Sequence, residues 1–130
     1  MASFIDDLAD YLADQGIGTV TEDIFVGSLP DTPDACIAIF QNLGREPSRY
    51  IPTADPDFQI LVRTEADKHN TAEAKCAAIV AILHQLANVE LQTGGVYAYF
   101  IALRSEPFPL GPDSNGRQEW TINFVAKTKR

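Results

Sequence analysis

The alternation of apolar and polar positions predicts a helix at the start of the chain. Three apolar residues recur at helical spacing, and acidic residues fill most positions between them; the apolar residues are Ile5, Leu8 and Leu12. Ser3 with Asp6 three residues later is typical of a helix N-terminus, and Gly16 suits the position just after a helix ends. We therefore expect a first helix between Ser3 and Gly16.

Five later segments have the pattern of β-strands, because they are rich in β-branched and aromatic residues or alternate between apolar and polar side chains. They are residues 23–27, 35–41, 58–64, 96–104 and 118–127. In the last segment, one face carries Trp120, Ile122, Phe124 and Ala126, and the other carries Glu119, Thr121, Asn123 and Val125. We expect segment 96–104 to pair with segment 118–127.

A second helix is predicted from Thr71 to about Asn88. Asn70 and Glu73 form its capping signal, and its apolar stripe comprises Cys76, Ile79, Leu83 and Leu86. The element order is then α-β-β-β-α-β-β. This order, in a chain of 130 residues, predicts a single α+β domain over residues 1–130 with an antiparallel or mixed sheet and both helices packed on one face.

Two long connections, 42–57 and 106–117, show no periodicity and are rich in proline or glycine. Such loops in a compact domain are often functional or flexible. Arg and Tyr are enriched at protein interfaces, so the first loop is a candidate contact surface; the alternative, a loop folded over its own core, stays open. The candidate interface residues in the two loops are Arg45, Arg49, Tyr50, Phe108, Leu110, Asp113 and Arg117.

The charge of the chain is uneven. Its net charge is −8, and residues 1–44 contain eight acidic residues but no Lys or Arg. Binding to DNA phosphates needs clustered Lys and Arg, so direct nucleic-acid binding is not expected, and the acidic helix face is interpreted as solvated. The chain has no apolar run of about 18 residues, and its N-terminus is acidic where a signal peptide is basic, so a membrane or secreted protein is not expected.

Candidate catalytic and metal-binding residues are few. Asp67 and His69 have a D-x-H spacing, but no third ligand is identifiable. Asp31 and Asp34 could form an acid–base pair, although backbone donors in a proline-rich turn are the favoured partners. His84, alone on the second helix, is interpreted as structural or exposed. A small hydrolase using Asp31, Asp34 or His69 is therefore a weak alternative, and we expect no enzyme.

No cofactor or metal site is expected, and no phosphate-binding glycine motif is present. The serines lack the surrounding motif of an esterase nucleophile. Cys36 and Cys76 lie in apolar settings without a neighbouring cysteine, so both are predicted to be reduced core residues. This fits assembly in a reducing cytoplasm.

Several short motifs occur in an order that resembles the tailed-phage tail terminator family, also called minor capsid or tail completion proteins. They are Ile24-Phe25-Val26-Gly27, Leu29-Pro30-Asp31, Pro33-Asp34, Gln59-Ile60-Leu61-Val62-Arg63, Pro107, Leu110-Gly111, Asp113, Gly116-Arg117 and Asn123-Phe124. The resemblance spans roughly residues 23–125.

The resemblance implies a structural virion protein of the tail or neck, assembled in the host cytoplasm. It would form a homohexameric ring on the head-proximal end of the tail tube, stop tube polymerisation and offer a surface for head–tail joining. Its partners would be other copies of itself, the major tail tube protein and a head-completion or neck protein, with DNA passing through the ring. The alternative is another neck component, a head-completion or adaptor protein that binds the portal.

Two hypotheses follow from this resemblance. The loops 42–57 and 106–117 would make the contacts between subunits or with partners. The acidic residues of the first helix would face the DNA passage, where like charge prevents sticking; these are Asp6, Asp7, Asp10 and Asp14.

Overall fold

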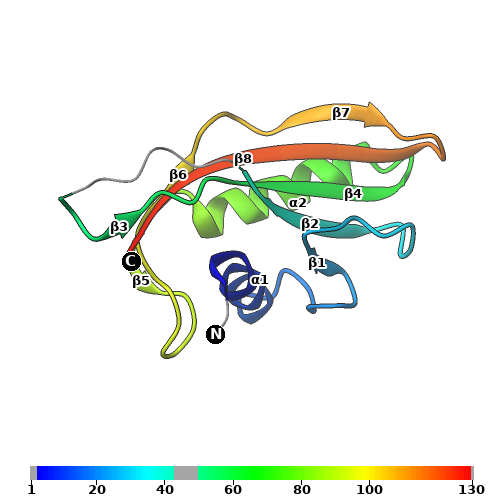
Figure 1. The fold of residues 1–130 in the computed structure, drawn as a ribbon. Helices are drawn as coiled ribbons and strands as arrows, with labels where there is room; N and C mark the ends of the chain where they lie inside the picture. The colour runs from blue at the N-terminus through cyan, green and yellow to red at the C-terminus, as the bar shows by residue number, and fades with distance from the viewer. Residues whose placement is uncertain (1–2, 43–49, 130) are drawn as a thin grey trace.

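Two helices and eight strands are present in the computed structural model, which describes residues 3–42 and 50–129 (Figure 1). In chain order they are α1 (Phe4–Asp14), β1 (Ile24–Val26), β2 (Cys36–Gln41), β3 (Thr53–Ala54), β4 (Phe58–Ala66), α2 (His69–Leu83), β5 (Leu86–Glu90), β6 (Tyr97–Leu103), β7 (Phe108–Pro112) and β8 (Arg117–Lys129). The predicted α+β class is confirmed.

All eight strands belong to one mixed sheet, in which six follow the order β1-β2-β4-β8-β6-β5 and the other two, β3 and β7, pair with β8. β1 runs parallel to β2, and the other pairs are antiparallel. The long strand β8 organises the sheet, since it pairs with β4 and β7 along its first half and with β6 and β3 along its second half. The predicted pairing of segments 96–104 and 118–127 is confirmed as β6 with β8.

The core lies between this sheet and the two helices. Phe58 of β4 stacks on Phe124 of β8 with ring centroids 4.9 Å apart, and Phe4 of α1 meets Phe58 edge-on at 5.4 Å. α2 adds Ile79 and Leu83 to the same apolar cluster. The predicted inner face of β8 is confirmed, because Trp120, Ile122, Phe124 and Ala126 are all buried.

The first helix begins and ends as predicted. The backbone N–H of Asp6 donates to Ser3 Oγ, and the Asp6 carboxylate accepts from Ser3, which completes a capping box. Gly16 follows the helix with a φ of +86°, a conformation that glycine adopts without strain. The interpretation of the acidic residues as a solvated face is wrong for Asp7, which is buried and accepts a 2.8 Å hydrogen bond from the backbone of Val96.

The prediction for the second helix is wrong at both ends. α2 starts at His69 after Lys68, so Asn70 lies inside the helix and does not cap it. The helix stops at Leu83, because Gln85 has a φ of +64° and the backbone N–H of Leu103 donates to His84 Nδ1 at 3.0 Å. Residues 86–90, predicted to continue the helix, form β5 and pair with β6.

Both long connections contain strand structure that the sequence pattern did not predict. The 42–57 segment contains the short strand β3, which pairs with the end of β8, while its residues 43–49 lie outside the described part of the chain. The 106–117 segment contains β7, which forms a hairpin with β8. The hairpin turn is closed by a backbone hydrogen bond from Gly116 to Asp113, and Gly116 has a φ of +77°.

Candidate interaction surface

Arg63 fixes the proline-rich turn before β2. It lies on the face of β4 opposite the core residues Ile60 and Val62, yet it is only 3% exposed. Its guanidinium donates to four backbone carbonyls of the turn: Nε to Asp34 at 2.9 Å, and Nη2 to Pro30 at 2.6 Å, Pro33 at 2.7 Å and Asp31 at 3.3 Å. One side chain thus satisfies most of the acceptors of a segment without secondary structure.

Arg117, at the start of β8, connects the same turn to the β7–β8 hairpin. Its Nε donates to Asp113 Oδ2 at 2.7 Å, and its Nη atoms lie 3.2 Å from Asp31 Oδ1 and 3.3 Å from Asp34 Oδ1. Residues 30–34 with Arg63, Asp113 and Arg117 are called the arginine clamp below. Asp31 and Asp34 therefore bind a guanidinium, and the prediction that backbone donors satisfy them is wrong.

The electrostatics of the clamp follow from these bonds. Burial raises the pKa of Asp113, but hydrogen bonds from the backbone and side chain of Arg117 outweigh it and hold this pKa below its usual value. Burial likewise lowers the pKa of Arg117, and the carboxylates of Asp113, Asp31 and Asp34 raise it above its usual value. The clamp is a charged structural joint between two segments more than 80 residues apart.

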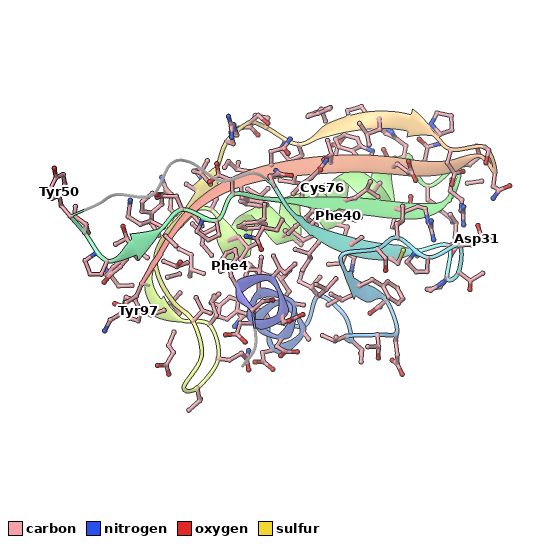
Figure 2. All side chains as sticks on the ribbon, viewed as in Figure 1. Phe4, Asp31, Phe40, Tyr50, Cys76 and Tyr97 are labelled. Atoms are coloured by element: carbon pink, nitrogen blue, oxygen red, sulfur yellow. The ribbon has the colours of Figure 1, made fainter. Side chains whose placement is uncertain are left out.

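Four large hydrophobic side chains among the described residues are exposed: Tyr50 at 92%, Ile51 at 59%, Leu110 at 51% and Phe108 at 44%. Tyr50 and Ile51, called the apolar tip below, precede β3 at one end of the molecule, where Tyr50 points away from the body (Figure 2). Phe108 and Leu110 lie on β7. Exposed apolar residues that gather in this way mark interaction sites in soluble proteins.

An open apolar groove of about 520 Å³ runs between α2 and the segment before β7. Cys76 and Val80 line it from the helix, Pro107 lies on the opposite side, and Trp120 of β8 also contributes. Two acidic residues also line the groove, Glu73 on α2 and Glu106 beside Pro107. The groove could not be predicted from the sequence, because its lining comes from three separate segments that only the fold brings together.

The structure divides the predicted interface residues into three groups. Tyr50, Phe108 and Leu110 have exposed side chains. Asp113 and Arg117 are joined to each other within the clamp, where Arg117 is only 8% exposed. Arg45 and Arg49 lie outside the described residues.

The residues considered as catalytic or metal-binding candidates make contacts that stabilise the fold. The ring of His69 packs on Trp120 with centroids 5.3 Å apart, and its Nε2 lies 3.8 Å from Glu73. Within residues 3–42 and 50–129, no group of three His, Cys, Asp or Glu side chains could hold a metal ion. His84, predicted on the second helix as structural or exposed, follows the end of α2, is exposed and accepts a hydrogen bond from the backbone of Leu103.

The two cysteines are free and buried, as predicted. Burial, with a smaller contribution from Glu73, raises the pKa of the Cys76 thiol to about 12, and burial also raises the pKa of Cys36. Neither thiol is therefore suited to act as a nucleophile near neutral pH. In the part of the chain that the structure describes, neither helix is long and apolar enough to cross a membrane.

Two solved protein chains have a fold similar to this one. A chain of the native gene transfer agent virion particle is 18% identical, with a TM-score of 0.67 over 97% of this chain and 91% of that chain. A second solved chain is 15% identical, with a TM-score of 0.56 over 98% of this chain and 90% of that one. At these identities the likeness shows the fold.

No curated protein sequence matches the chain. A family model described as bacteriophage tail terminator protein matches residues 11–130, which is nearly the whole chain. The resemblance seen in the short sequence motifs is thereby confirmed, and the family is one of structural virion proteins and not of enzymes. The chain belongs to the bacteriophage tail terminator protein family.

Proposed function

We propose that this protein forms a hexameric ring on the head-proximal end of the phage tail tube, where it stops tube polymerisation and provides the surface for head–tail joining. The observation that carries the proposal is the family match over residues 11–130. The similar fold of a chain in the gene transfer agent virion supports it, because that chain belongs to an assembled particle. Its partners would be further copies of itself, the tail tube protein and a head-completion or neck protein.

The geometry fits a binding role better than a catalytic one. The described part of the chain presents an apolar tip, an apolar pair on β7 and an apolar groove, while its buried arginines are committed to the clamp. Surfaces of this kind supply contact area between proteins.

Native mass spectrometry over a range of protein concentration and salt tests the ring. Six copies of the 14.2 kDa chain give a closed species of about 85 kDa. Addition to growing tail tubes tests the second part of the proposal, since a terminator should arrest elongation at substoichiometric amounts relative to tube subunits. Binding to purified portal with no effect on tube length would instead support the adaptor alternative.

The acidic residues of α1 are proposed to face the DNA passage only where they are exposed. Asp6, Asp10 and Asp14 meet this condition, whereas Asp7 is buried. Their like charge would keep DNA from adhering to the ring. A structure of the assembled ring with these three carboxylates on its outer rim would refute this assignment.

A further inference from the structure

We propose that neighbouring copies in the ring are joined by insertion of the apolar tip, Tyr50 and Ile51, of one copy into the groove between α2 and Pro107 of the next. This inference rests on the proposed ring and names the contact that builds it. It combines two surfaces that a monomer leaves open, a protruding apolar pair and an apolar hollow.

The tip has the properties of an anchor. Tyr50 and Ile51 are adjacent, and both are large and mostly exposed. Tyrosine is enriched at interfaces because it buries a large apolar area while its hydroxyl keeps a polar partner. A side chain 92% exposed gains far more apolar burial on association than one already half covered.

The groove has the properties of a receptor. Its volume of about 520 Å³ lies in the range that accommodates one or two large side chains. Trp120 lines it, and its indole gives the groove an aromatic wall against which an apolar side chain can pack.

The occupant must come from another copy. β3, next to the tip, pairs Thr53 with Lys129 at the end of β8, whereas Trp120 lies nine residues earlier on that strand, about 30 Å away along an extended chain. Tyr50 and Cys76 are well separated in the view of Figure 2. A contact between two different and distant patches is heterologous, which is the kind that closes into a ring.

Charge at the two surfaces is complementary. Lys129 is exposed beside β3 and the tip, where Glu90 lines the same hollow, while Glu73 and Glu106 stand at the groove. Each copy carries a net charge of −8, so copies repel one another except where opposite charges meet locally. Assembly through this contact therefore places a cation of one copy against carboxylates of the next.

Native mass spectrometry of three variants tests the contact. Tyr50→Ser combined with Ile51→Ser removes the tip, and Ala81→Arg fills the groove from an exposed helical position that lines it. Ala78→Arg is the matched control, because it makes the same change at an exposed position of α2 outside the groove lining. Assembly is measured in solution and on purified tail tubes.

The tip and groove variants should each need at least about a tenfold higher concentration to assemble, whereas Ala78→Arg should behave like the wild type. An equimolar mixture of the tip and groove variants should give a dimer of about 28 kDa, two copies of 14.2 kDa, and nothing larger. Each pair of one tip variant and one groove variant has a single intact tip and a single intact groove, so the dimer cannot grow further. Unfolded variants would not form such a dimer.

Three results would overturn the inference. Rings formed by both variants at the wild-type concentration would show that another surface joins the copies, and would leave the proposed ring intact. A mixture that stays monomeric, although both variants have the circular dichroism spectrum of the folded wild type, would exclude the tip and groove as mutual partners. A wild-type protein that stays monomeric in solution and on tail tubes would overturn both the contact and the ring.

Discussion

Replacement of Arg63 by methionine should destabilise the protein strongly, although Arg63 lies on the face of β4 opposite the core residues Ile60 and Val62. Methionine keeps much of the apolar stem of the side chain but removes every donor. The carbonyl oxygens of Pro30, Pro33 and Asp34 would then lose the guanidinium that holds them, while that of Asp31 would keep its bond from Arg117. The turn they form is also the segment that Arg117 ties to the β7–β8 hairpin.

The expected loss follows from the bonds. Three of the four are no longer than 2.9 Å, and a hydrogen bond to a charged group contributes about 1.5–3 kcal/mol. Residues 31–34 are exposed, so water can replace part of what is lost. We therefore expect the free energy of unfolding to fall by about 3 kcal/mol, which corresponds to a decrease in Tm of roughly 10 °C for a domain of this size.

Urea unfolding followed by the fluorescence of the single tryptophan, Trp120, measures this loss. Protein is kept dilute, because assembly would add its own stability. Lys75→Met is the matched control, since Lys75 donates to one carbonyl only, that of Ile17 at 3.0 Å, and should cost about 1 kcal/mol. An Arg63→Met variant no less stable than the Lys75→Met variant would refute the role assigned to the four carbonyl bonds.

Three further predictions concern the first helix, the cysteines and the clamp. Ser3→Ala should lower the free energy of unfolding by about 1 kcal/mol in the same urea assay, because the capping box is lost. Ellman's reagent at pH 8 should find no reactive thiol in the native protein and two per chain in urea, since Cys36 and Cys76 are buried and the pKa of Cys76 is raised to about 12; rapid native reaction would contradict this. The folded state holds the pKa of Asp113 below its usual 3.8, so its stabilising contribution is complete above that value and is lost as pH falls through the lower folded value. Asp113→Asn should therefore have a lower free energy of unfolding than the wild type at pH 7, and that free energy should fall less between pH 5 and 3. An equal fall in the free energy of unfolding of the two proteins over this pH range would count against the clamp.

Local signals predicted the elements that depend on neighbouring residues. The Ser3 and Asp6 pair, the apolar spacing of α1 and the alternation of β8 each act within a few residues, and the structure agrees with all three. The end of α2 could not be predicted in this way. Leu86 continues the apolar stripe of that helix, but pairing of residues 86–90 with β6 requires Gln85 to turn the chain.

The prolines of β7 misled the prediction for a related reason. Pro109 and Pro112 lack a backbone donor and are typical of a loop, yet both occur in a strand that pairs with β8. The arginine clamp could not be predicted from the sequence either. Arg117 and Asp31 are 86 residues apart in the sequence, and only the folded sheet brings them together. The exposed members of the predicted interface were found because Tyr50, Phe108 and Leu110 lie in segments without apolar periodicity.

The length of β8 has a mechanical consequence. This one strand of 13 residues extends for about 40 Å, with the clamp at its first residue and the partner of β3, beside the apolar tip, at its last. Neighbouring strands pair along it on both sides, so it resists bending in the plane of the sheet. Because the clamp and the residues beside the apolar tip belong to one paired strand, a contact made at either end would hold the same continuous element of the subunit.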